Sequence, residues 1–543
     1  MPRWALAEHG SAQRHAPSRC SLPDRLSAPP VRALRPHFTA TECPLRVFYP
    51  VQHPLQNFPN HPSLNRNRTD PLGVLSHTAP TNPCHTRPAV LTLEVSSLSL
   101  DDPQQEQGER PLLLLIGSSA RRNREFILRS VTRRYRLWLL QPTEVSWEEP
   151  YLTGFTMVDN TDQDKLVAAA LEVAAAHPVA GVFCYDEGLV WPAAFAAEAL
   201  GVPGNSPAAI AACRDKATTR AALAAAEVPQ PESSAVASLA EARVTAQRIG
   251  YPVVLKPRGL AGSMGVRRAN TPGELADAYA AASAASYPNV PVYRDGVLVE
   301  EYVDGPEISV DSVFYQGVCT PLVVARKQVG FEPFFEEVGH LVDAADPLLT
   351  DDRLTTLLDR SHRALGFLNG VTHTEFRLTE RGPVLLEVNA RLGGDLIPYL
   401  GWLAGGVDSA MAAADVAAGR EPEVDRSRRA VAAVRFLYPE RDTEVVSVTV
   451  REDRVVPPIH TAFPMAADGA RLRLPPRGYI ARYGCVIAVA DSGHEAQAAL
   501  VDAADIVRLD GRPLGTDGVH LGMDGVMDGA QLGMDGGIDR AQP

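Results

Sequence analysis

The chain has 543 residues, a formal net charge of -13, and a composition that is 45% hydrophobic and 22% charged. Because this length exceeds a single hydrophobic core, we expect two or three domains with room for a cleft. The negative charge argues against nucleic acid as a partner, since polyanions are bound mainly through lysine and arginine. No stretch has the apolar length that crossing a bilayer needs, so no membrane partner is expected either.

The cysteines and the start of the chain bear on its location. Seven cysteines are scattered without a CxxC pair, which argues against a disulfide framework and against a zinc site. The first residues lack the apolar run of a secretory signal. We therefore expect a cytoplasmic protein.

The first predicted domain follows a long polar segment. Residues 1–108 are rich in Pro, Arg, His, Asn and Ser, keep neither helical nor strand periodicity, and are predicted to be disordered. In residues 109–213, strands are predicted at 112–116, 137–140 and 179–185, and helices at 121–131, 166–176 and after Trp191. This alternation predicts a Rossmann-like open parallel α/β domain. The turn at 117–120 lacks the GxGxxG spacing of a dinucleotide site.

Three further segments differ in pattern. Residues 214–425 mix strands and helices and contain most of the chemically informative residues. Residues 426–512 predict a smaller α+β domain, with strands at 430–438, 444–450 and 479–490 and a helix at 495–506. Residues 513–543 repeat Leu-Gly-x-Asp-Gly without the spacing of a calcium loop and predict a low-complexity tail.

The segment 372–389 predicts a β-hairpin that turns at Arg381. A register symmetric about Arg381 places Glu375 opposite Glu387 and His373 opposite Asn389. The same register pairs Phe376 with Leu386 and Leu378 with Val384, so that these four residues and Val388 share the core face.

Two glutamates opposed across a hairpin repel each other, since their Cβ atoms lie about 4.5–5.5 Å apart. A hard divalent cation would offset the repulsion, because Mg²⁺ prefers carboxylate and amide oxygens. We therefore predict a metal site formed by Glu375, Glu387 and Asn389. The alternative is a solvated face on which the glutamates pair with Arg377 and Arg391.

A second pattern indicates an anion site. The apolar strand from Gly250 ends in Lys256 and runs into a glycine-rich turn. There Gly262 and Gly265 allow backbone N–H groups to approach an anion, and Ser263 adds a hydroxyl donor. The turn does not fit GxxxxGK[ST], which excludes a P-loop, and an ordinary hairpin loop is the alternative.

The order of these parts resembles the ATP-grasp superfamily over roughly residues 214–425. The matching positions are Lys216, Lys256 with its glycine-rich turn, Glu300 to Glu307, Glu375, and Glu387 to Arg391. The resemblance implies α/β and α+β domains arranged as an ATP-grasp fold, with a preceding Rossmann-like domain and a small C-terminal α+β domain. It implies ATP and Mg²⁺ as cofactors, with Mn²⁺ as an alternative ion.

The resemblance also assigns roles to single residues. Lys216 and Lys256 would hold the ATP phosphates, Gly262, Ser263 and Gly265 would close over them, Glu300, Glu301 and Val303 would contact adenine, and Glu307 would bind the ribose. Lys327 is a weaker phosphate candidate, placed with Arg391 among the catalytic residues. Arg391 would stabilise the oxyanion of a tetrahedral intermediate.

On the substrate side, Phe334 to His340 and Arg391 to Asp395 resemble the L-amino-acid ligase branch. Glu337 would then pair with a substrate ammonium, and His340 would line the same pocket. The implied function is an ATP-dependent ligase that joins a small carboxylate to an amine through an acyl phosphate, with an amino acid as one substrate. Dimers are common among relatives, so a homodimer is among the expected states.

Two other functions fit part of this pattern. Biotin carboxylase shares the ATP-side residues, but the chain lacks a biotin-carrying lysine motif and its glycine turn is sparser. A nucleotide-binding sensor without turnover is the non-enzymatic alternative, and retention of both glutamates, Asn389 and Arg391 argues against it.

Overall fold

The computed structural model describes residues 110–285 and 296–515. The predicted disordered segment at 1–108 lies outside these residues, and so does nearly all of the predicted tail. Within the described ranges, no helix combines the length and the apolar character that crossing a membrane requires.

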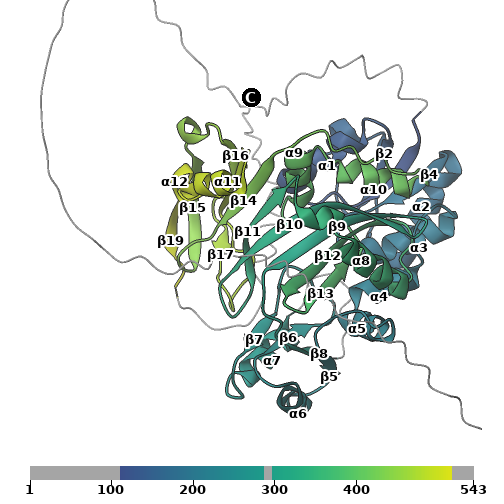
Figure 1. Ribbon diagram of the computed structural model, residues 1–543. Helices are drawn as coiled ribbons and strands as arrows, with labels where there is room; N and C mark the ends of the chain where they lie inside the picture. Colours follow the sequence, from purple (N-terminus) through teal and green to yellow (C-terminus); the bar gives the residue numbers. More distant parts are fainter. Residues whose placement is uncertain (1–109, 286–295, 516–543) are drawn as a thin grey trace, which may run out of the picture. The chain divides into compact units, whose positions relative to one another are not determined.

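The described chain begins with a parallel sheet of four strands in the order β3-β2-β1-β4 (Figure 1). Its strands are β1 (Leu112–Ile116), β2 (Arg136–Gln141), β3 (Gly154–Met157) and β4 (Val179–Phe183), and its helices are α1 (Arg121–Val131), α2 (Gln163–Ala176) and α3 (Val190–Leu200). Leu113 and Leu115 pack in one core cluster, whereas Leu114 and Ile116 pack in another. Burial on both faces explains why β1 is apolar throughout, and the predicted open parallel α/β unit is confirmed.

A smaller antiparallel sheet carries the glycine-rich turn. It is preceded by helices α4 (Pro207–Arg214) and α5 (Lys216–Ala225). Its strands lie in the order β5 (Ser233–Val236), β8 (Val297–Glu301), β6 (Val253–Pro257) and β7 (Arg267–Ala269). Two helices pack on this sheet, α6 (Leu239–Ile249) and α7 (Leu275–Ala284). The glycine-rich turn joins β6 to β7, so it follows directly on Lys256.

The largest sheet has eight antiparallel strands (Figure 1). In spatial order they are β13 (Gly382–Asn389), β12 (Gly370–Thr379), β9 (Glu307–Tyr315), β10 (Val318–Gly330), β11 (Glu336–Asp343), β14 (Val431–Leu437), β18 (Gly484–Ala490) and β16 (Ile459–Pro464). The associated helices are α8 (Asp352–Leu365), α9 (Ile397–Gly405) and α10 (Ser409–Ala417). Within this sheet β11 pairs with β14, and these two strands lie on either side of the domain boundary predicted between residues 425 and 426. That boundary stays a prediction.

The hairpin β12–β13 has the predicted register in one half only. Glu375 lies opposite Glu387 and His373 opposite Asn389, as predicted. Beyond Glu375 the register shifts, so Phe376 pairs with Leu385 instead of Leu386, and the predicted partners of Phe376 and Leu378 are wrong. The cause is a β-bulge, which sets two residues of one strand against one of the other. Sequence alternation alone contains no signal for it.

The bulge also changes which leucine is in the core. Leu385 is fully buried in the cluster under the sheet. Leu386, which was predicted to be a core residue, instead lines a cleft on the other side of the hairpin.

Two predicted elements near the C-terminus also differ. The strand predicted at 479–490 begins only at Gly484, because Ile480 has a positive φ of 55° and its N–H group is bound by a side chain instead of a neighbouring strand. The helix predicted at 495–506 is divided into α11 (Gly493–Ala499) and α12 (Ala503–Ile506). Between these two helices, backbone N–H groups bond to the carbonyl oxygen three residues earlier, as in a turn, instead of four residues earlier, as in an α-helix. A small antiparallel sheet of β17 (Arg471–Leu472), β15 (Thr443–Val450) and β19 (Val507–Pro513) completes this part.

Candidate functional site

A single cleft gathers most of the predicted site residues. It is bordered by the glycine-rich turn, strand β8, the hairpin β12–β13, the start of β11 and the loop before β18. The predicted residues that line it are Lys216, Lys256, Gly262, Ser263, Glu300, Glu301, Val303, Glu307, Glu337, Glu375, Glu387, Asn389 and Arg391. Gly265, Lys327 and His340 do not line it, but Lys327 and His340 contact carboxylates that do.

The two phosphate-side lysines are each held by a carboxylate. Lys256 Nζ lies 2.6 Å from Glu300 Oε2, and Arg220 Nε lies 2.6 Å from the other oxygen of Glu300. Lys216 Nζ lies 3.0 Å from Glu387 Oε1. Burial lowers the pKa of Lys256, and the charge of Glu300 opposes that shift. The carboxylate of Glu300 therefore pairs with Lys256 and Arg220, and the predicted contact of its side chain with adenine stays a prediction.

The glycine-rich turn has the backbone conformation that close approach requires. Gly262, Ser263 and Gly265 all have positive φ values, of 65°, 55° and 74°. A Cβ atom at Gly265 would come within 2.4 Å of the side chain of Ala285, so only glycine fits there.

At the start of β9, the carboxylate of Glu307 lines the cleft and is held by two cationic side chains. Its carboxylate pairs with Lys327 at 3.0 Å and with Arg377 at 2.7 Å. Nearby, the rings of Tyr302 and Phe335 stack with their centroids 6.2 Å apart. These rings and Val303 give this end of the cleft an apolar wall.

The predicted metal ligands lie together on the cleft face of the hairpin. Glu375 is bound by Lys327 Nζ at 2.9 Å, and Glu387 by Lys216. These two lysines offset the repulsion between the glutamates, so the opposition alone does not require a cation. The predicted alternative partners are engaged elsewhere, because Arg377 pairs with Glu307 and Arg391 with a residue of another loop.

The chemistry of these ligands nevertheless suits Mg²⁺. Asn389 donates its amide nitrogen to the carbonyl oxygen of His373 at 3.5 Å, and its side-chain oxygen accepts no hydrogen bond from the part of the chain that the structure describes. Two carboxylates and a free amide oxygen beside two lysines could hold a divalent ion and the phosphates it bridges. The metal assignment stays a prediction.

A buried histidine fixes one of these glutamates. His373 Nδ1 lies 2.7 Å from Asp311 and its Nε2 lies 3.4 Å from Glu375. Burial alone would lower the pKa of His373, but the two carboxylates outweigh it and raise the pKa to about 9. Asp311 also accepts from the backbone N–H of Gly393, where a Cβ atom would collide with it at 2.7 Å.

Lys327 joins the two halves of the cleft. Its ammonium group lies within 2.5–3.0 Å of Glu307, Glu337 and Glu375, and its side chain is 1% exposed. Burial opposes the charged form, but the three carboxylates raise the pKa of Lys327 well above its ordinary value.

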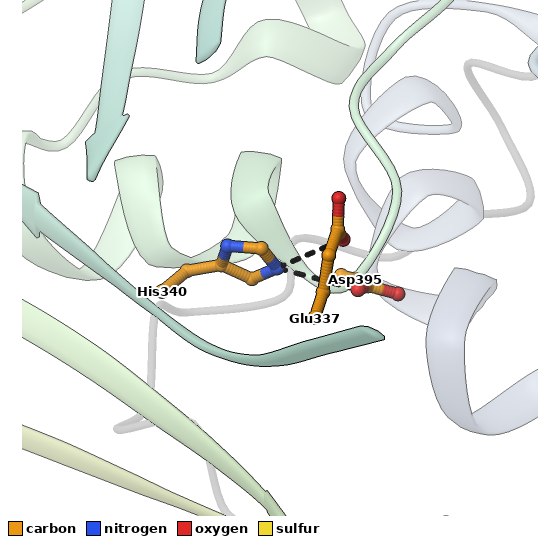
Figure 2. A group of neighbouring side chains, drawn as sticks. All are labelled: Glu337, His340 and Asp395. Carbon is orange, nitrogen blue, oxygen red and sulfur yellow. Dashed lines mark hydrogen bonds and ion pairs between the residues drawn. The ribbon is translucent and has the colours of Figure 1, made fainter. Parts of the chain in front are cut away.

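Glu337 and His340 of β11 converge with Asp395 (Figure 2). His340 Nε2 lies 3.5 Å from Glu337 and 3.3 Å from Asp395. Burial acts to lower the pKa of His340, but the hydrogen bonds and charges of these carboxylates raise it overall. Arg482 binds both oxygens of Asp395, at 2.6 and 2.7 Å. Because Arg482 and Lys327 already balance this cluster, an ion-pair network describes it better than a metal centre.

Arg391 reaches the cleft from the end of β13 and is held by the N-terminal α/β unit. Its Nε lies 2.7 Å from Glu187, in the loop after β4, and its NH1 donates to the carbonyl oxygen of Leu392. Glu187 also lies 3.5 Å from Arg214.

Several residues of the site were not singled out from the sequence. Asp395 lines the cleft and ends the segment 391–395 that resembles the L-amino-acid ligase branch, but no role was predicted for it. Glu336 lines the cleft beside Glu337. The only sign of it in the sequence was its position next to another glutamate. Arg482 lies in a segment predicted to be a strand, and no local pattern marks it.

Comparison with known proteins finds two matching family models and a similar protein. Family models match for the ATP-grasp domain over residues 249–398 and for the L-amino acid ligase C-terminal domain 2 over residues 435–510. The uncharacterized protein y4rH of Sinorhizobium fredii is 31% identical over 359 residues, which cover 63% of this chain and 72% of that protein.

Characterised relatives are matched over shorter spans. The alanine–anticapsin ligase of Bacillus subtilis is 27% identical over 49% of this chain and 59% of its own length, so the chain spans less than two thirds of that relative. The crystal structure of an L-amino acid ligase from Bacillus licheniformis superposes with a TM-score of 0.62, covering 74% of this chain and 99% of that one. At 20% identity, this last likeness shows the fold alone.

Proposed function

Because the chain belongs to the ATP-grasp carboxylate–amine ligases, in the branch that carries the L-amino acid ligase C-terminal domain, we propose that it joins an amino acid to an amine through an acyl phosphate. One observation carries the proposal. The lysines suited to phosphate and the acidic pocket suited to an ammonium group open into the same cleft, and Lys327 lies between them.

In this proposal the nucleotide occupies the end of the cleft formed by the smaller sheet. Lys216 and Lys256 neutralise its phosphates, and the N–H groups at Gly262 and Ser263 bind phosphate oxygens. The backbone of Glu301 to Val303 meets the adenine, and Glu307 accepts from the ribose hydroxyls.

The hairpin then provides the metal ligands. Glu375, Glu387 and Asn389 would hold Mg²⁺, or Mn²⁺ in its place, and the ion would neutralise charge on the phosphoryl group that moves. His373 keeps Glu375 turned toward the cleft, and Lys216 bridges Glu387 to the phosphate side.

At the other end, Glu337 receives the amino-acid substrate and pairs with its ammonium group, and the buried His340 holds Glu337 in place instead of lining the pocket itself. Arg391 donates to the oxyanion that forms when the amine attacks the acyl phosphate. A second copy of the chain is not needed for any of these contacts, although a homodimer stays an expected state.

The test is a matrix of amino acids and amines assayed for release of ADP and phosphate from ATP. A ligase of this kind releases both products only when a carboxylate and an amine are supplied together, and mass spectrometry then detects the amide. Turnover that depends on bicarbonate would instead indicate the carboxylase alternative. ATP binding without net hydrolysis in any combination would indicate a sensor and would contradict the proposal.

A further inference from the structure

One acidic residue of the cleft differs from all the others. Among the residues that the structure describes, every other acidic side chain lining the cleft forms an ion pair with a lysine, arginine or histidine. Glu336 forms none, although its residue is only 1% exposed. A buried carboxyl group without a cationic partner needs an explanation.

The two oxygens of Glu336 have unequal surroundings. Oε2 accepts from the Tyr438 hydroxyl at 3.0 Å and from the backbone N–H of Ile480 at 3.0 Å. Oε1 is buried and has no hydrogen-bond partner. Arg482, a cation that acts on Glu336 electrostatically, is bound to Asp395 and to the Tyr438 hydroxyl instead. Glu336 therefore has one fixed oxygen and one acceptor without a partner, on a side chain that lines the cleft.

We propose that Glu336 is the proton acceptor for the amine substrate. This inference rests on the proposed function, because an amine enters as an ammonium ion and must lose a proton before it can attack. In the step, Oε1 of Glu336 takes one proton from the ammonium group, and the freed electron pair forms the carbon–nitrogen bond. The bond between the acyl carbon and the phosphate oxygen breaks, and its electron pair leaves with phosphate, which takes the second N–H proton. Glu336 later returns its proton to water.

The electrostatics of the cleft favour Glu336 over its neighbours for this role. Burial raises the pKa of Glu336 to about 7, against the opposing effects of the Ile480 N–H, the Tyr438 hydroxyl and Arg482. Glu337 and Tyr479 are the other ionisable groups that interact with it. By contrast, Arg482 and His340 outweigh burial and hold the pKa of Asp395 well below its usual range, which makes Asp395 a weak base. General bases work best when their pKa lies near the working pH.

The experiment compares Glu336→Gln with the wild-type chain for two nucleophiles. One is the amine found in the phosphate-release matrix, and the other is hydroxylamine, which is largely unprotonated at neutral pH and needs no base. With the amine, we expect the variant to lose about 10²-fold or more in rate, the usual contribution of a general base. With hydroxylamine, hydroxamate formation should stay near the wild-type rate. Parallel losses with both nucleophiles would show a structural role and overturn the inference.

Two further readouts separate the possible failures. If the wild-type chain forms neither amide nor hydroxamate, the proposed function fails together with the inference. If it forms both and Glu336→Gln slows neither, only the inference fails. Tyr438→Phe is the matched variant, because it removes a donor that lowers the pKa of Glu336 but keeps the carboxyl group. It should shift the acidic limb of the rate profile for the amine to higher pH, and an unshifted limb would contradict the role of Glu336.

Discussion

Three carboxylates, one each from β9, β11 and β12, contact the same buried ammonium group, that of Lys327. Removing it by Lys327→Met would leave these acids unpaired, which typically costs about 3–5 kcal/mol for a buried charge network. Lys165→Met is the matched control, since Lys165 is 60% exposed and its partners Asp159 and Asp162 are exposed too, so these pairs should contribute little. Equal losses of thermal stability in the two variants would contradict this view of Lys327.

The loss should also depend on pH. Burial acts to raise the pKa of Glu375, but Lys327 and His373 bring it well below its ordinary value of 4.5. A depressed carboxyl pKa stabilises the folded state above the ordinary value, and this stabilisation disappears as the pH falls through the folded-state pKa. The difference in melting temperature between wild type and Lys327→Met should therefore stay near its full size down to the ordinary value of 4.5 and shrink only below it. A difference that does not shrink as the pH is lowered further would exclude the electrostatic explanation.

Glu387 is the residue on which the metal prediction is tested most directly. Glu387→Gln keeps an acceptor for Lys216 but removes the charge that would bind a divalent ion. We expect turnover to fall by at least about 10–100-fold, the loss that even an outer partner of a metal ligand can cause, and the apparent affinity for Mg²⁺ to fall with it. Unchanged dependence of the rate on Mg²⁺ concentration would contradict the metal assignment.

At the scale of elements, the bulge in β13 separates two adjacent leucines. Leu385 is fully buried in the core, so Leu385→Ala should destabilise the fold by about 2–5 kcal/mol. Leu386 lines the cleft, so Leu386→Ala should leave unfolding nearly unchanged and weaken ATP binding instead. Denaturant unfolding and nucleotide titration of both variants distinguish the two positions. The opposite pattern would favour the symmetric register.

The same hairpin shows what the sequence can predict. Alternation and residue type were sufficient to place Glu375 opposite Glu387, because one face of the hairpin is core. They could not predict the bulge, because alternation of residue types does not mark the extra residue that one strand inserts. Likewise, Lys256 at the end of an apolar strand was recognisable, but Arg220 on α5, which shares the carboxylate of Glu300 with it, was not. Local periodicity contains no information on such long-range pairs.

At the scale of the whole described chain, the catalytic candidate Arg391 depends on a contact with the N-terminal α/β unit. Glu187, in the loop after β4, is the acidic partner of its guanidinium group. Glu187→Gln should weaken this hold and lower kcat, by less than the about 10²–10³-fold that loss of an oxyanion donor costs. The KM for ATP should change little, because Glu187 pairs with arginines and with neither of the lysines proposed to bind the phosphates.

Glu198→Gln is the control for this effect, because Glu198 is exposed on α3 of the same unit and is not part of the cleft. A general loosening of the unit would affect the KM for ATP and the thermal stability of both variants alike. A specific fall in kcat for Glu187→Gln alone would mean that the parallel sheet acts as more than a scaffold. Its loops would then set the position of the arginine that faces the reacting carbonyl.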